Sequence, residues 1–194
     1  MLVCMRTPDA GHPELTVPDT DRRATVLESA LVTFARFGYR KTSMEAVAQA
    51  ARISRPGLYF LFSSKESLFR AAVTQALERD LAAVELTLSS SDQPLRDRLL
   101  DSFDQWAGRY LGPLAHELEV VIEDNPDLLG TLVETTPRRF ESLVANALSV
   151  ESGAEAAPRL AQTIISTSIG IKHQVDSRED YRERMAVALE LIVR

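Results

Sequence analysis

The chain has 194 residues, of which 45% are hydrophobic and 26% charged, a balance typical of one or two compact domains with an ample core. No apolar run approaches the roughly 18 residues of a membrane-spanning helix, and the N-terminus has no secretory signal, so we expect a cytoplasmic protein without a membrane partner. The single cysteine, Cys4, excludes an intramolecular disulfide and a thiolate metal cluster.

The net charge of −6 is unevenly distributed along the chain. Residues 19–70 contain nine Lys/Arg and five Asp/Glu, a balance of +4, whereas the remainder contains 13 and 23, a balance of −10. A basic stretch of this kind is typical of a region that binds nucleic acid. The acidity of the remainder would keep other surfaces away from DNA, although an ordinary solvated helical surface has the same composition.

The first part of the chain combines a tail with a helix. Residues 1–19 are rich in proline and small polar residues and lack a periodic apolar pattern, which predicts a disordered tail. A helix is predicted over 21–37, because its apolar residues recur at helical spacing and Gly38 follows as a stop. Arg22 and Arg23 at its start are either phosphate ligands or simply solvated residues.

Residues 42–69 contain three helix starts within a short stretch. Thr42 and Glu45 have the spacing of a capping box, so the first helix is predicted to begin there or one residue later. Ser54 precedes a second helix with a proline in its first turn, where a missing amide costs little, and Leu58 and Phe62 are predicted to form its inward face. Ser63, with a glutamate three residues on, repeats the capping-box spacing before a third, longer helix. The pattern predicts a helix-turn-helix.

In a helix-turn-helix the second helix enters the major groove, and the flanking elements touch phosphate. That geometry places Arg55, Gly57 and Tyr59 toward the groove, with Arg55 able to pair with a guanine. Hydroxyl groups, cationic side chains and helix N-termini are the usual phosphate ligands. The candidate residues for binding double-stranded DNA are therefore Thr42, Ser43, Arg52, Ser54, Arg55, Gly57, Tyr59 and Lys65.

Residues 22–73 carry a resemblance to a known family. The segment resembles the N-terminal DNA-binding domain of TetR-family transcriptional regulators, and the positions in register are Phe37, Gly38, Thr42, Val47, Ala48, Ser54, Leu58, Tyr59, Phe62, Lys65, Glu66 and Leu68. The resemblance implies that Tyr59 and Lys65 bind phosphate. Two positions depart from the family pattern. Arg52 replaces a frequent glycine, which would strain a left-handed backbone by about 1 kcal/mol, and Leu61 replaces a frequent histidine.

The rest of the chain is predicted to be helical, so the fold class is all-α. From residue 64 the helical pattern continues to about residue 88, a rod of roughly 37 Å. Further helices are predicted over 94–110, 113–124, 126–150, 156–175 and 178–193, and Pro137 is expected to kink or split one of them. We expect a helix-turn-helix domain over 20–70 and a regulatory and dimerisation domain over 71–194.

Two apolar stripes form the candidate dimer surface, because TetR-like proteins generally dimerise by pairing two such helices with those of a partner. They consist of Leu160, Ile164, Ser168, Ile171 and Val175 on one helix and Tyr181, Met185, Leu189 and Ile192 on the next. Packing of each stripe inside its own subunit is an equal alternative. A two-fold dimer requires a palindromic operator with matching half-sites.

The resemblance also implies a small-molecule site among the middle helices. Three aromatic residues lie at spacings of three and four on one helix face, which suits the wall of an apolar pocket. The candidate ligand-binding residues are Phe103, Trp106, Tyr110, His116 and Phe140. Ordinary core packing produces the same spacing and is the alternative.

The sequence thus predicts a TetR-like repressor that binds a palindromic operator as a homodimer and is released by a small-molecule effector. A ligand-independent or activating helix-turn-helix protein is the alternative, and a helical-bundle enzyme is a more remote one. His116 and Glu119 have a spacing usable for a metal, but no second such pair exists. No nucleophile elbow, phosphate loop or dinucleotide fingerprint occurs. We therefore expect no catalytic residue, metal site or cofactor.

Overall fold

A computed structural model of the chain describes residues 17–111 and 126–193. Within these ranges the regular structure is helical throughout, which confirms the all-α prediction. The predicted tail up to residue 16 and the helix predicted over 113–124 lie outside the described residues. None of the described helices is long and apolar enough to cross a membrane.

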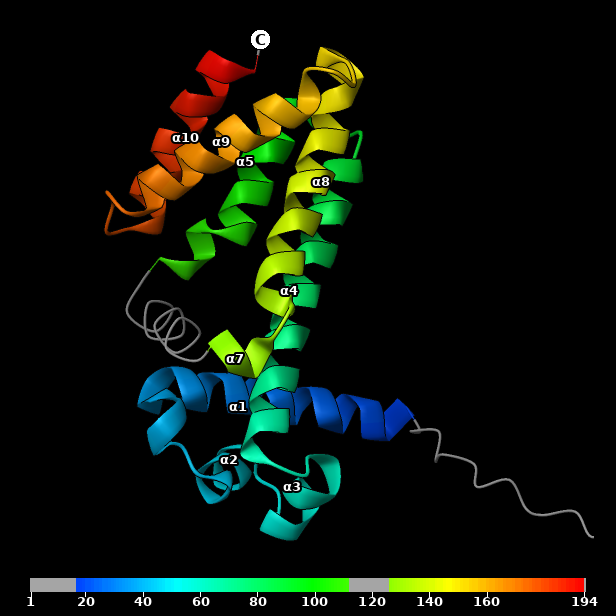
Figure 1. Cartoon of the computed structure of the whole chain (residues 1–194), viewed down its shortest axis with the longest axis vertical. Helices are drawn as coiled ribbons and strands as arrows, with labels where there is room; N and C mark the ends of the chain where they lie inside the picture. Colours follow the sequence, from blue (N-terminus) through cyan, green and yellow to red (C-terminus); the bar gives the residue numbers. More distant parts are fainter. Residues whose placement is uncertain (1–16, 112–125, 194) are drawn as a thin grey trace, which may run out of the picture.

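The N-terminal helices form one end of the molecule, which we call the head. Helix α1 (Val17–Lys41) lies across the start of α4 (Lys65–Ser89), with α2 (Met44–Ala50) and α3 (Arg55–Leu61) beyond it (Figure 1). Their buried apolar side chains, from Val26 to Val73, form the head core, in which Phe69 meets Phe34 edge-to-face at 5.1 Å. The helix-turn-helix therefore has its own hydrophobic core.

The starts and ends of the head helices agree with the sequence to within a few residues. Helix α1 begins at Val17, earlier than predicted, and loses helical geometry at Gly38 (φ 75°), where the stop was expected. Ser54 caps α3 as predicted. The other two N-caps are Ser43 and Ser64, one residue later than the first member of each predicted capping box.

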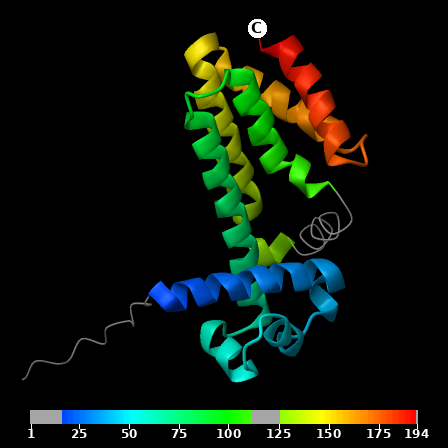
Figure 2. The same cartoon turned by 180° about the vertical axis from the view of Figure 1, so that it is seen from behind.

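The remaining helices pack around the far half of α4 and form the body. They are α5 (Leu95–Trp106), the short 3-10 helix η1 (Gly108–Tyr110), α8 (Leu132–Ser152), α9 (Ala157–Lys172) and α10 (Arg178–Ile192). Their buried side chains, from Leu81 to Val193, form the body core. Figure 2 shows α4 passing from the head into the body, so one helix contributes to both cores.

Helix α7 (Pro126–Leu129) joins the two parts and corrects one prediction. Pro137 does not split its helix, because α8 runs through that residue. The break lies at Gly130, whose φ of 57° suits glycine and ends α7. Leu129 of α7 belongs to the head core. The chain therefore touches the head again before it enters α8.

Helices α5 and α10 are joined by a half-buried group of ion pairs. Arg178 donates to both carboxylate oxygens of Asp104, at 2.8 and 2.6 Å, and Arg182 contacts the same carboxylate at 3.3 Å. The hydrogen bonds from Arg178 lower the pKa of Asp104 below its ordinary value, against the opposing effect of burial. Gly108 lies so close that an added Cβ would meet Asp104 Oδ1 at 2.6 Å. The carboxylate is thus held from several sides.

The two stripes predicted as a dimer surface face inward, so that assignment needs correction. Three of the nine residues, Leu160, Val175 and Ile192, are half-buried against the body core, and the other six are buried within it: Ile164, Ser168, Ile171, Tyr181, Met185 and Leu189. The alternative, packing inside the chain, is what the structure shows. Helical periodicity identifies an apolar face but not the neighbour that covers it.

Candidate nucleic-acid interface and central cavity

Helix α3 presents its polar and aromatic residues on the outside of the head. Leu58 is fully buried and anchors the helix in the head core. The Ser54 hydroxyl accepts from the Gly57 amide at 3.1 Å, which fixes the first turn. Tyr59 is 43% exposed, and the Arg55 guanidinium lies 5.7 Å from the centre of its ring. Arg55 and Tyr59 therefore form one exposed patch.

Arg55 is only loosely held by its own chain. Its Nε lies 3.8 Å from Glu45 Oε2, and both side chains are more than half exposed. An exposed pair of this kind contributes little to stability. The guanidinium can therefore exchange Glu45 for a phosphate or a base edge at little cost.

Arg52 lies in the turn between α2 and α3 with a φ of 55°. This is the left-handed backbone conformation for which the sequence predicted strain. Its amide donates to the Gln49 carbonyl at 3.1 Å, and the next amide, of Ile53, donates to Ala48 at 3.0 Å. These bonds hold the turn closed and leave the Arg52 side chain exposed. It remains available to DNA beside α3.

The hydroxyl groups of Thr42 and Ser43 have different environments. Thr42 is only 2% exposed, and its hydroxyl donates to the Gly38 carbonyl at 2.8 Å. Thr42 is therefore turned inward, away from any phosphate, which corrects its place among the DNA-binding candidates. Ser43 is exposed and accepts from the Ala46 amide at 3.1 Å, so its own hydroxyl hydrogen is available to a ligand.

Lys65 is half-buried, and its ammonium group contacts the backbone of the head. Its Nζ donates to the carbonyl oxygens of Tyr39 at 3.0 Å, Arg40 at 3.4 Å and Thr42 at 3.1 Å. An ammonium group has three N–H donors, so all of them are used. Carbonyls at the end of a helix lack intrahelical partners, and Lys65 satisfies those at the end of α1. The phosphate role implied for Lys65 stays a prediction, and it would require the ammonium group to exchange one of these carbonyls for a phosphate oxygen.

Phe60 is an exposed residue of α3 that was not among the DNA-binding residues predicted from the sequence. Its side chain is 86% exposed, the same fraction as Val150 far away in the body. A signal was present, because Leu58 and Phe62 were both expected to face inward and Phe60 lies midway between them. Because residues four apart lie on the same helix face, the residue midway between two inward residues points outward.

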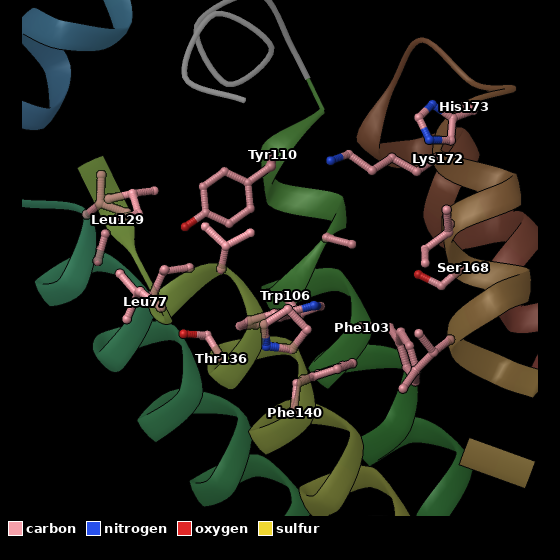
Figure 3. Close-up of a pocket in the computed structure, with 18 of the residues that line it drawn as sticks. Leu77, Phe103, Trp106, Tyr110, Leu129, Thr136, Phe140, Ser168, Lys172 and His173 are labelled. Carbon is pink, nitrogen blue, oxygen red and sulfur yellow. The ribbon is translucent and has the colours of Figure 1, made fainter. Parts of the chain in front are cut away.

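The second candidate site is a cavity of about 480 Å³ between the body helices and the head (Figure 3). Trp106 and Phe140 stack in its wall with ring centres 4.6 Å apart, and Phe103 meets Phe140 edge-on at 5.2 Å. Tyr110 lines the same cavity from η1. Four of the five predicted ligand-binding residues thus lie together, and His116 falls outside the described residues.

The polar groups of the cavity lie around this aromatic wall. Ser168 shares a 2.6 Å hydrogen bond with Tyr181, and the Tyr110 hydroxyl donates to buried Asp80. Burial, opposed by the Ser168 hydrogen bond, raises the pKa of Tyr181 to about 12, so its hydroxyl stays protonated at neutral pH. Lys172 and His173 line the end of the cavity at the C-terminus of α9 (Figure 3). Within the described ranges no group of three His, Cys, Asp or Glu side chains could hold a metal ion.

The head forms one wall of this cavity. Leu31 of α1 and Leu129 of α7 both line it, and Leu129 is also part of the head core. Arg70 Nε donates to the Leu128 carbonyl at 2.8 Å and ties α7 to α4. A molecule in the cavity would therefore touch both ends of the protein.

Comparison with known proteins gives matches along much of the chain. Residues 26–72 match the model of bacterial regulatory proteins of the tetR family. The HTH-type transcriptional regulator YfiR of Bacillus subtilis (strain 168) is 35% identical over 133 residues, 68% of this chain and 55% of YfiR, so this chain spans just over half of that relative. The nicotine-responsive repressor HdnoR of Paenarthrobacter nicotinovorans is 23% identical over 158 residues, 78% of this chain and 81% of HdnoR.

Solved structures show the same fold. The crystal structure of the reduced form of NemR from E. coli superposes with a TM-score of 0.71, covering 89% of this chain and 98% of NemR at 20% identity. A sequence identity of this size indicates a shared fold and nothing further. The similarity extends over both the head and the body, since it covers most of each chain.

Proposed function

This chain belongs to the TetR family of transcriptional regulators, which are DNA-binding proteins and not enzymes, and we propose that it acts as a ligand-released repressor. In this proposal a cytoplasmic homodimer binds a palindromic operator through α3, and a small molecule in the central cavity releases it. The observation that carries the proposal is the aromatic cavity that reaches the head core through Leu31 and Leu129.

The dimer in this proposal uses the outward faces of α9 and α10. Val187 and Leu191 are exposed on α10, on the side opposite the body core, and Ile169, which also lines the central cavity, is exposed on α9. Exposed apolar residues on neighbouring helices suit a partner that covers them. A two-fold pair of such faces would hold two heads at a fixed separation, as a palindromic operator requires.

Gly170 provides a direct test of the dimer. It lies on α9, and an added Cβ would meet nothing within 4 Å, so the chain itself tolerates a larger side chain there. We expect Gly170→Arg to fold normally but to sediment as a monomer and bind the operator weakly. Leu86→Arg, at an exposed position on α4, is the control and should remain dimeric. A Gly170→Arg protein that stays dimeric would place the interface elsewhere.

The effector proposed here is a flat apolar or aromatic molecule. Trp106 lines the cavity and is only partly buried, so its indole ring can stack on such a ligand while buried Phe140 packs against it. The cavity volume of about 480 Å³ lies within the range typical of small-molecule sites. HdnoR, which responds to nicotine by its name, supports a small molecule as the signal. Occupation of the cavity would displace Leu129 or Leu31, and both contact the head.

The experiment begins with the purified protein and fragmented genomic DNA, retained at two salt concentrations and sequenced. We expect a palindromic site that survives the higher salt, because base contacts persist when phosphate contacts are screened. A panel of aromatic compounds is then titrated while the fluorescence of Trp106, the single tryptophan, is recorded. A compound that changes the fluorescence should also release the operator.

A cavity-filling variant separates the ligand-released repressor from a ligand-independent regulator. Ala107 lines the cavity, so Ala107→Leu should retain operator binding but lose the response to the active compound. Retention of operator by the wild type with every compound tested, with no change in thermal stability, would favour the ligand-independent alternative. Activation instead of repression would appear as lower reporter expression when the chain is deleted.

A further inference from the structure

Phe60 exposes a large apolar side chain on the helix that faces DNA. Its 86% exposure is unusual in its setting, because the neighbouring contacts of α3 are made by hydroxyl, amide and guanidinium groups. A single exposed apolar residue elsewhere on a protein needs no explanation. Here the same residue lies on a seven-residue helix that, in the proposed function, enters the major groove.

Helix geometry places Phe60 at the part of α3 farthest from the head core. At about 100° per residue, Phe60 and Pro56 both lie about 200° around the helix from buried Leu58, on the opposite side. Arg55 and Tyr59 lie to one side of Phe60 around the helix. When α3 lies in the groove, the flanks approach the phosphate walls, and Phe60 points to the base-pair floor.

The phenyl ring limits what Phe60 can recognise. It has no hydrogen-bond donor or acceptor, so it cannot bind a phosphate oxygen or pair with a polar base edge. Among the groups that base pairs present in the major groove, the C5-methyl group of thymine is apolar and is contacted by side chains such as phenylalanine. The cationic neighbours Arg52 and Arg55 favour a polyanion over an apolar protein surface as the occupant of this face.

We propose that Phe60 is a specificity-determining residue that recognises the C5-methyl group of one thymine in each operator half-site. The inference rests on the proposed function only in that the chain binds a specific operator. It does not depend on the effector or on the sign of regulation. Pro56, on the same side of α3, would lie against the neighbouring step and exclude water from the contact.

The test uses the operator recovered by fragment enrichment and a set of duplexes in which each thymine in turn is replaced by deoxyuracil. This replacement removes the methyl group and leaves every hydrogen-bonding group in place. We expect one symmetric thymine position per half-site to be sensitive, with a loss of about fourfold in affinity for each methyl removed. The other thymine positions should show no change.

Variants assign that sensitivity to Phe60. Phe60→Ala should bind the thymine operator as weakly as it binds the deoxyuracil operator at the sensitive position, and Phe60→Leu should retain part of the discrimination. Because Phe60 is almost fully exposed, neither variant should change the thermal unfolding of the free protein. Val150→Ala removes an equally exposed apolar side chain from the body and should bind like the wild type.

Three results would overturn the proposal. If the wild type binds all deoxyuracil duplexes equally, no methyl group is read. If Phe60→Ala keeps the same sensitive thymine, another residue reads it, and if Phe60→Ala weakens all duplexes by one factor, the ring packs on the DNA backbone. Each of these leaves the proposed operator binding intact. Recovery of no specific sequence at all would overturn both proposals together.

Discussion

The head and the body are both small helical cores, yet they hold their candidate functional residues in opposite places. In the head, Arg55, Tyr59 and Phe60 are on the surface, and the core only positions them. In the body, Trp106 and Phe140 line an interior cavity, so core residues and candidate ligand contacts are the same side chains. Mutations of these exposed head residues should therefore change DNA binding without changing stability, whereas mutations of the cavity wall should change ligand binding and stability together.

The largest expected effect tests whether the two cores are independent. Phe69 is fully buried and meets both Phe34 and Tyr39 at 5.1 Å. We expect Phe69→Ala to destabilise the head by about 3–5 kcal/mol and to abolish operator binding. The unfolding transition reported by Trp106 in the body should stay where it is in the wild type.

The matched variant is Phe103→Ala, since Phe103 is equally buried in the body core. It should lower the temperature of the unfolding transition reported by Trp106 by a similar amount. The head helices, followed by circular dichroism, should unfold as in the wild type. If both variants lower both transitions equally, the head and the body unfold as one unit through α4 and α7.

A smaller effect is expected from the ammonium group of Lys65. Lys65→Met removes a charged donor from three carbonyl oxygens and should destabilise the head by about 2 kcal/mol. The salt dependence of operator binding should keep its slope, because no phosphate contact is lost. Lys41→Met, at an exposed position nearby, is the control for charge. A slope reduced by about one in Lys65→Met alone would restore Lys65 as a phosphate ligand.

We expect Asp104 to make the stability of the body more sensitive to acid than that of the head. Its folded pKa is below the unfolded value of 3.8, so the stability it contributes is present above about pH 4 and is lost as pH falls through the folded value. We expect the Trp106 transition to fall more steeply in acid for the wild type than for Asp104→Asn. The Asn variant should be the less stable protein at neutral pH. Parallel curves for the two proteins would remove Asp104 as the cause.

The smallest effect concerns the strained turn of the head. Arg52 has a φ of 55°, so Arg52→Gly should stabilise the head by at most about 1 kcal/mol, measured by thermal unfolding. Gln49→Gly, inside α2, should instead destabilise it by a similar amount. Operator affinity should fall in Arg52→Gly if the guanidinium contacts DNA, even as stability rises. A variant less stable than the wild type would mean that the strain relieved is smaller than the entropy that glycine adds to the unfolded chain.

The sequence predicted those features of the head that depend on local chemistry. The Ser54 cap, the stop at Gly38 and the inward Leu58 and Phe62 follow from rules that involve neighbours within one turn. It did not predict the backbone contacts of Lys65, because the carbonyls that accept from its ammonium group lie more than twenty residues away along the chain. The N-cap shifts to Ser43 because the Thr42 hydroxyl donates instead to the Gly38 carbonyl, four residues earlier in the chain.

For the body, the sequence predicted which residues share a helix face but not what each face packs against. The spacing of Phe103, Trp106 and Tyr110 placed them on one face, and the structure adds that this face lines a cavity. The stripe containing Ile164 and Tyr181 was equally visible, but burial within the chain or against a partner has the same periodicity. Only three-dimensional packing distinguishes the two.

Helix α4 has 25 residues and is therefore about 37 Å long. It is held near one end by the head core and along the other half by the body core. By simple trigonometry on that length, a tilt of about 5° at the body end moves the other end by about 3 Å, close to the spacing of one base pair along DNA. In a symmetric dimer the two heads would move in opposite senses, so the lever doubles the mismatch with the operator. A ligand that tilts α4 by this small angle would thus move the two heads of a dimer out of register with the operator.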